Sequence, residues 1–138
     1  LYDDLIRLCF VKEKNIRELI FENLNPDWIL SNIHKDIYDV VYIHLKATDY
    51  PPISVIAEQI VDKKTRQKAI DLTFDIDRLK PQFAMAIDCL VRIEQFILNQ
   101  QVDKLREKLK HSSDTDILNQ LLSIEKNIEQ IAKKYNEQ

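Results

Sequence analysis

Apolar side chains recur along the chain at the spacing of α-helices. In residues 2–11 they crowd into one short apolar segment, and in residues 15–24 they fall three and four positions apart on one stripe. Asn25-Pro26-Asp27 follows, where proline suits the first turn of a helix and asparagine can cap it. The pattern therefore predicts two helices, a stop, and a further helix over residues 27–47 with a break near Ser31-Asn32.

Prolines divide the middle of the chain into shorter elements. Pro51-Pro52 cannot continue a helix, so the preceding helix must end before it. Short helices are predicted over residues 54–61 and 65–74. Pro81 then suits a first helical turn, and no breaker interrupts the sequence from there to Lys110. We expect one long helix here, apolar on several sides at first and on a single stripe later.

A polar turn at residues 111–114 precedes the last helix, which is predicted over residues 114–135. Ser113 and Asp116 resemble a capping box at its start. The stripe of this helix repeats with spacings of four and three, which is a heptad seam, and the later part of the long helix does the same. The seam residues are Leu98, Val102, Leu105 and Leu109 in the long helix, and Ile117, Leu121, Ile124, Ile128, Ile131 and Tyr135 in the last helix.

Two seam-bearing helices joined by a short polar turn form an antiparallel hairpin in which each helix buries its seam on the other. We therefore expect an all-α chain with a compact multi-helix bundle over residues 1–98. A C-terminal helical hairpin is expected over residues 99–138, with the long helix crossing the boundary. Leu118 and Leu122 widen the seam and offer an apolar anchor to a partner.

Composition narrows the possible functions. The chain has no glycine, which excludes the glycine loops of Walker and dinucleotide-binding motifs. A net charge of −3 disfavours duplex nucleic acid as the main partner, and no apolar run approaches the roughly 18 residues of a membrane span. Cys9 and Cys89 stand in apolar stretches without a CxxC partner, so we expect buried free thiols and a cytoplasmic location.

Residues that could support catalysis are scattered. The three histidines form no metal motif, and His34 is expected to make a local hydrogen bond. The pairs Asp3-Asp4, Asp75-Asp77 and Asp114-Asp116 can in principle hold Mg²⁺, but each lies at a predicted helix end, where aspartate caps the helix and complements its dipole. No nucleophile signature occurs. We therefore expect no catalytic, metal-binding or cofactor-binding residue, and so a non-catalytic domain.

A basic cluster follows the predicted helix at residues 54–61. It consists of Lys63, Lys64, Arg66 and Lys68. A solvated helix face is the simpler interpretation, and a docking patch for an acidic protein surface or a nucleic-acid strand is the alternative.

The order of these elements resembles the C-terminal domain of bacterial DNA primase, a compact helical bundle followed by a helical hairpin. Residues 3–8 resemble its opening helix, residues 28–38 its middle helix, and residues 92–109 with 118–134 its hairpin, so the resemblance covers essentially the whole chain. It implies a domain that docks primase on the replicative DNA helicase through the hairpin and modulates the helicase through the bundle. The primer-synthesising chemistry would lie in other domains.

Partner-binding residues of that family cluster on the hairpin, and the resemblance carries them over only as a region. The implied contacts are Leu118, Leu121, Leu122, Gln130, Ile131, Lys133, Lys134 and Tyr135. The N-terminal collar domain of the replicative helicase has a similar fold and is the alternative, with the hairpin serving dimerisation. Its opening helix usually contains glycine, which this chain lacks. An enzyme is the third hypothesis, which primer synthesis by this chain alone would support.

Overall fold

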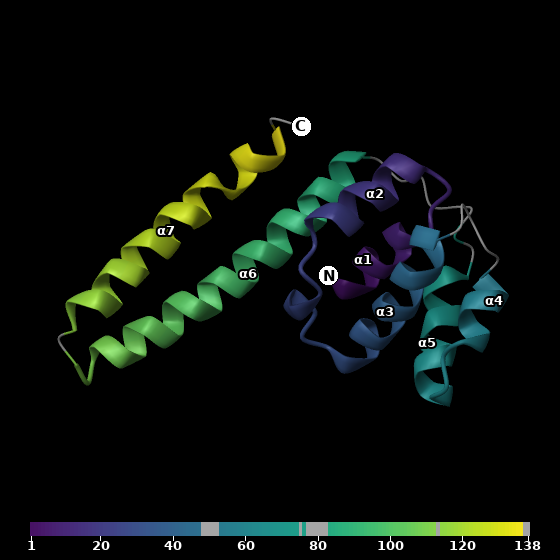
Figure 1. Cartoon of the computed structure of the whole chain (residues 1–138), viewed down its shortest axis with the longest axis horizontal. Helices are drawn as coiled ribbons and strands as arrows, with labels where there is room; N and C mark the ends of the chain where they lie inside the picture. The colour runs from purple at the N-terminus through teal and green to yellow at the C-terminus, as the bar shows by residue number, and fades with distance from the viewer. Residues whose placement is uncertain (48–52, 75, 77–82, 113, 137–138) are drawn as a thin grey trace. The chain divides into compact units, whose positions relative to one another are not determined.

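The computed structural model describes residues 1–47, 53–74, 76, 83–112 and 114–136. All regular secondary structure in these ranges is helical, which confirms the predicted all-α class (Figure 1). The elements in chain order are α1 (Tyr2–Cys9), α2 (Lys14–Asn23), the 3₁₀ turn η1 (Pro26–Trp28), α3 (Asn32–Ala47), α4 (Ile53–Glu58), α5 (Lys63–Thr73), α6 (Phe83–Leu109) and α7 (Thr115–Asn136).

The chain divides into two compact units, Leu1–Leu90 and Val91–Gln138. The division falls inside α6, so that the first turns of this helix belong to one unit and the rest to the other. We call the first unit the body and the second the hairpin, and each is described by itself.

Helix α1 lies at the centre of the body and packs against α2, α3 and α5. Its sequence suits a helix at both ends, because Asp3 and Asp4 stand in the first turn and Arg7 in the last, where they complement the helix dipole. Apolar positions three and four apart on each helix meet in one core. Fully buried side chains of this core include Leu5, Ile6, Leu8, Ile20, Ile37, Val41 and Ile56.

The predicted stop between the second and third helices is confirmed. The side chain of Asn25 accepts a hydrogen bond of 3.0 Å from the backbone N–H of Asp27, and Pro26 occupies the first turn of η1. The turn ends at Trp28, and α3 begins at Asn32, which confirms the break expected near Ser31-Asn32. The diproline at residues 51–52 and Pro81 lie outside the described residues.

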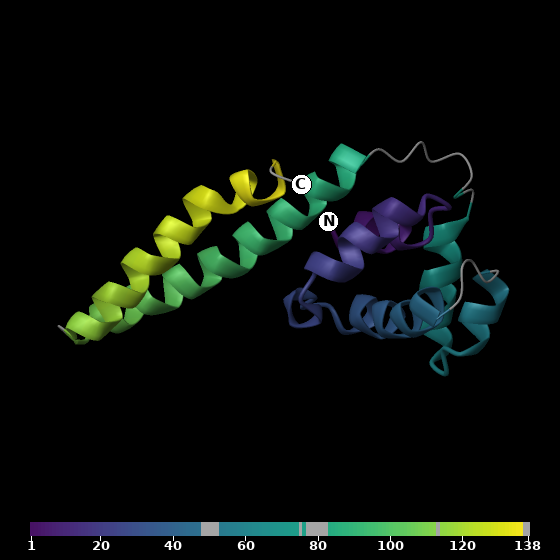
Figure 2. The same ribbon diagram turned by 45° about the horizontal axis from the view of Figure 1, so that its top comes forward.

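The hairpin consists of α7 running antiparallel to α6 (Figures 1 and 2). Val102, Leu105 and Leu121 form its buried centre, as the heptad seams predict. Beside the seam, Arg106 donates a 3.0 Å hydrogen bond to Glu125 across the two helices. Partly buried side chains that pack on this centre are Leu109, Ile117, Ile124 and Ile128.

The start of α7 is capped by the side chain of Asp114, which accepts a hydrogen bond of 2.8 Å from the backbone N–H of Asp116. This confirms the capping role expected for the pair Asp114-Asp116. Ser113, the first member of the expected capping box, lies outside the described residues.

Candidate partner-binding surface of the hairpin

The expected contact residues of the hairpin divide into a buried and an exposed group. Leu121, Ile131 and Tyr135 are buried along the seam, where they hold α7 on α6. The hydroxyl of Tyr135 donates a hydrogen bond of 3.2 Å to Glu94 of α6. Burial of the ring raises the pKa of Tyr135, and the carboxylate of Glu94 raises it further. These three side chains therefore contribute to the packing of α7 on α6.

Leu118 and Leu122 lie on the outer face of α7, one helical turn apart, and are 45% and 55% exposed. Leu121, between them in sequence, is only 7% exposed, because one residue rotates the side chain by about 100° around the helix. The two leucines thus form an exposed apolar pair that lies outside the buried centre of the hairpin. Such a pair among exposed polar residues of the helix is a candidate anchor for another protein.

Gln130, Lys133 and Lys134 are exposed near the end of α7. All three line a hollow of about 610 Å³ between α6 and α7, together with Glu94 and Leu98. The ammonium of Lys134 lies 3.7 Å from the carboxylate of Glu94 and 5.2 Å from the ring centroid of Tyr135. Lys134 is therefore positioned by its neighbours, whereas no ion pair with Lys133 occurs among the described residues.

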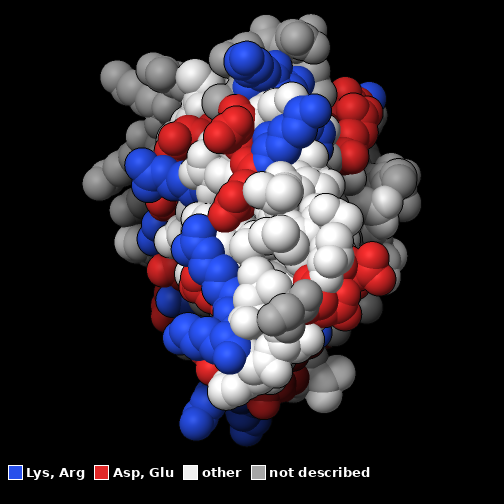
Figure 3. Space-filling model, turned by 90° about the vertical axis from the view of Figure 1, so that its left-hand side faces the viewer, with Lys and Arg blue, Asp and Glu red and all other residues white. Residues whose placement is uncertain are grey.

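Figure 3 shows the chain from the side on which α6 and α7 are joined. Uncharged side chains form a continuous area in this view, and both basic and acidic side chains lie along its borders.

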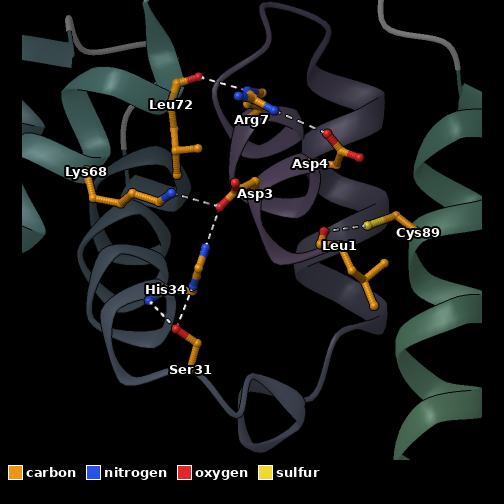
Figure 4. Close-up of polar contacts among 9 residues, drawn as sticks. All are labelled: Leu1, Asp3, Asp4, Arg7, Ser31, His34, Lys68, Leu72 and Cys89. Atoms are coloured by element: carbon orange, nitrogen blue, oxygen red, sulfur yellow. Dashed lines mark hydrogen bonds and ion pairs between the residues drawn. The ribbon is translucent and has the colours of Figure 1, made fainter.

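A second group of polar side chains joins three helices of the body (Figure 4). Oδ1 of Asp3 lies 2.6 Å from Nε2 of His34 and 3.3 Å from Nζ of Lys68. Nδ1 of the same histidine lies 2.6 Å from Oγ of Ser31, which confirms the local hydrogen bond expected for His34. The hydrogen bond from His34 lowers the pKa of the Asp3 carboxyl, and Lys68 lowers it further.

The capping role expected for Asp3 and Asp4 is therefore wrong for α1, whose start has no side-chain cap. Both carboxylates stand in the first turn, but Asp3 reaches α3 and α5 instead, and Asp4 pairs with Arg7 at 3.3 Å. The guanidinium of Arg7 also donates to the carbonyl of Leu72 at 3.2 Å. Asp3 and Arg7 find these partners on α3 and α5, which pack against α1, and the spacing of residues in the sequence does not reveal such contacts.

Ser31, His34 and Asp3 form a chain of contacts of 2.6 Å each that joins the start of α3 to α1. The hydroxyl of Ser31 lies at the start of α3, where it accepts from the backbone N–H of His34 at 3.4 Å as well as facing the imidazole ring. Lys68 also shares the carboxylate oxygen that faces His34.

Two members of the basic cluster bond within the body. Arg66 donates to the carbonyl of Ile60 at 3.0 Å and so holds the loop before α5, while Lys68 pairs with Asp3. Lys63 and Lys64 are exposed at the start of α5. The solvated-face interpretation thus fits the first two lysines of the cluster, and an internal role fits the other two residues.

The remaining candidate chemistry lies in the core or is dispersed. Both cysteines are buried free thiols, as predicted, and burial raises the pKa of the Cys9 thiol, with a further contribution from Cys89. In the described ranges, no three His, Cys, Asp or Glu side chains are grouped to hold a metal ion. None of the described helices has the length together with the apolar character that a membrane-spanning segment requires.

Comparison of the chain with known proteins found no matching family model, no matching curated protein and no matching solved structure. The function proposed below therefore depends on the chain's own residues and on the resemblance drawn from them.

Proposed function

We propose that this chain is a protein-interaction domain whose hairpin docks on the replicative DNA helicase, as the helicase-interaction domain of a bacterial DNA primase. The observation that carries the proposal is the pair Leu118 and Leu122, which is exposed on α7 while the two helices already pack on each other through other residues. The bundle-plus-hairpin architecture agrees with the one that the resemblance implies. In this proposal the parent protein synthesises RNA primers in the cytoplasm with other domains, and this domain is not catalytic.

The leucine pair alone is too small to explain stable docking. Complete burial of a leucine is worth about 1.5–3 kcal/mol, and these two are already about half covered. Together they supply on the order of 2 kcal/mol, whereas a micromolar complex requires about 8 kcal/mol. Further contacts must come from the same arm, and Gln130, Lys133 and Lys134 are exposed on it.

A binding assay with variants of the exposed leucines tests the proposal. Titration of the chain against the hexameric helicase of the same organism should give micromolar or tighter binding, which removal of residues 112–138 abolishes. The double variant Leu118→Ser/Leu122→Ser should bind at least about tenfold more weakly. The control is Ile43→Ser/Val61→Ser, which removes two exposed apolar side chains from the body instead. Full affinity after the hairpin is removed would reject the proposed docking arm.

The same leucine pair also supports a second candidate function. In the helicase collar, Leu118 and Leu122 would pair with their copies across a two-fold axis and make the hairpin a dimerisation element. Sedimentation over a wide range of concentrations separates the two candidates. A monomer at every concentration rejects the collar, and a dimer that Leu118→Ser/Leu122→Ser dissociates supports it.

A further inference from the structure

The hairpin has a second surface, a groove between α6 and α7 that runs along one side of the seam. Two hollows lie in it, of about 610 Å³ and about 250 Å³. Five of the α6 residues that line them follow spacings of four, three, four and three, and so do five of the α7 residues, while Lys104, Gln130 and Lys133 line the hollows beside these two series. Each series therefore occupies one face of its helix. The two series are Glu94, Leu98, Gln101, Leu105 and Lys108 in α6, and Gln120, Ile124, Asn127, Ile131 and Lys134 in α7.

Seam residues form the apolar floor of the groove. Leu105 and Ile131 are buried, but Leu98 and Ile124 are only partly covered. A two-helix hairpin leaves one side of each seam open, because each helix has only one neighbour. In bundles of three or more helices that side is closed by another helix. The floor residues thus have the spacing of core positions in a helical bundle, but Leu98 and Ile124 are only partly covered because no third helix packs on them in the described part of the hairpin.

Charges on the groove are mainly positive, although the chain as a whole carries a net charge of −3. Lys104 and Lys108 line the hollow nearer the turn, which has no acidic lining residue among those described. Lys133 and Lys134 line the other hollow. Its one carboxylate, Glu94, is already engaged by Tyr135 and Lys134. The groove therefore favours a partner with negative charge beside an apolar stripe.

We propose that this groove accepts a helix of the docking partner, with an apolar stripe on the floor and acidic side chains against the four lysines. The inference rests on the proposed function, since it assigns the partner chemistry of the same arm. A third helix would cover Leu98 and Ile124, and exposed amides at Gln101, Gln120 and Asn127 can bond to its polar side chains. In α7, the series from Gln120 to Lys134 lies on another face of the helix than Leu118 and Leu122, and Lys133, eleven positions after Leu122, lies on the face of the two leucines. The arm therefore has two contact surfaces that share α7.

Two synthetic helices test the groove independently of any helicase. Both are peptides of about three heptads with leucine at the a and d positions, one flanked by glutamate and its twin by lysine. The acidic peptide should bind the full chain at least about tenfold more tightly than the basic one at low ionic strength. Equal binding of the twins, or no binding of either, overturns the proposal.

Charge reversal in the groove locates the contact. Lys104→Glu/Lys108→Glu should weaken acidic-peptide binding at least about fivefold. The matched control is Lys110→Glu/Lys126→Glu, which changes the net charge equally at exposed positions outside the groove lining. If both double variants lose the same affinity, the effect is one of overall charge and the proposal fails.

A steric variant covers the case in which charge reversal disturbs the helix. Gln101→Trp fills the groove from an exposed position, while Asn99→Trp places the same ring on an exposed position of α6 outside it. Only the first should block the acidic peptide.

The same variants separate this inference from the proposed function. If the helicase binds Gln101→Trp normally but does not bind Leu118→Ser/Leu122→Ser, the docking function stands and the groove proposal falls. If the acidic peptide binds in the groove and the helicase does not bind the chain at all, the helicase assignment falls instead.

Discussion

Tyr135 donates its phenolic O–H to Glu94 Oε2 at 3.2 Å, which joins the last turns of α7 to the part of α6 that lies 41 positions earlier in sequence. The tyrosine is buried and Glu94 is also 3.7 Å from Lys134. This contact closes the open end of the hairpin, opposite the turn that joins its helices.

Replacement of Tyr135 by phenylalanine should therefore lower the free energy of unfolding of the hairpin by about 1 kcal/mol, the usual net value of one hydrogen bond. Tyr135→Ala should cost about 3–5 kcal/mol, because the ring also fills the seam. Urea denaturation followed by circular dichroism measures both values. A Phe variant as unstable as the Ala variant would show that the hydrogen bond, not the ring, holds this end.

The raised pKa of Tyr135 gives the same contact a pH dependence. The unfolded tyrosine ionises near pH 10, whereas the folded one keeps its proton, so the unfolded state binds fewer protons above that pH and stability falls as pH rises. The advantage of the natural protein over Tyr135→Phe should be complete below about pH 10 and shrink above it. An advantage that stays constant up to about pH 11 would contradict the assigned burial.

The variant Asp3→Asn tests the contacts of Asp3 with His34 and Lys68 in the body. The carboxyl of Asp3 has a lowered pKa, so its contribution is present above the unfolded value near 3.9 and is lost as pH falls through the folded value. Because the side chain of Asp3 is 42% exposed, we expect Asp3→Asn to lower the free energy of unfolding by only about 1 kcal/mol at pH 7. This difference should shrink below about pH 4. Asp4→Asn is the control, since Asp4 pairs only with Arg7 on its own helix among the described contacts. If both variants lose the same free energy of unfolding, the contacts of Asp3 with His34 and Lys68 do not stabilise the body.

Neighbouring leucines of α7 should differ sharply in their importance for stability. Leu121→Ala opens the buried centre of the hairpin and should cost about 2–4 kcal/mol. Leu122→Ala alters a side chain that is 55% exposed and should change stability by less than about 0.5 kcal/mol. Thermal unfolding of the two variants measures the difference, and similar losses would place Leu122 in the seam.

Both thiols should resist modification in the folded protein. Cys9 and Cys89 are buried, and the raised pKa of Cys9 leaves little thiolate to react. N-ethylmaleimide at pH 8 should therefore label the native chain slowly and label both positions quickly in denaturant, as mass spectrometry can record. Rapid labelling of Cys9 without denaturant would mean that the core of the body opens readily.

The hairpin could be predicted from sequence because its stabilising contacts follow a local rule. The heptad spacing from Ile117 to Tyr135 places one residue of each turn on the same face, so the seam is visible without knowledge of the partner helix. The Asn25 cap was likewise predictable, since its acceptor and donor are two positions apart.

The hydrogen bond between Asp3 and His34 could not be predicted from local spacing. The two residues are 31 positions apart, and the location of Asp3 in a first helical turn suggested only a cap. Its true partners depend on how α1, α3 and α5 pack. The groove could not be predicted either. The sequence shows which residues form a seam, but it does not show on which side of the seam the two helices leave a hollow.

The long-range contacts of α1 also determine when the body can be completed during protein synthesis. The carbonyl of Leu1 accepts a hydrogen bond from the thiol of Cys89 at 3.8 Å, and Arg7 reaches the carbonyl of Leu72. A ribosome releases α1 long before these partners exist. Helices α2, α3 and α5 can pack on α1 as they emerge, but the contacts of α1 are complete only after Cys89 has been translated. The hairpin pairs two successive segments and can form as soon as its second helix emerges.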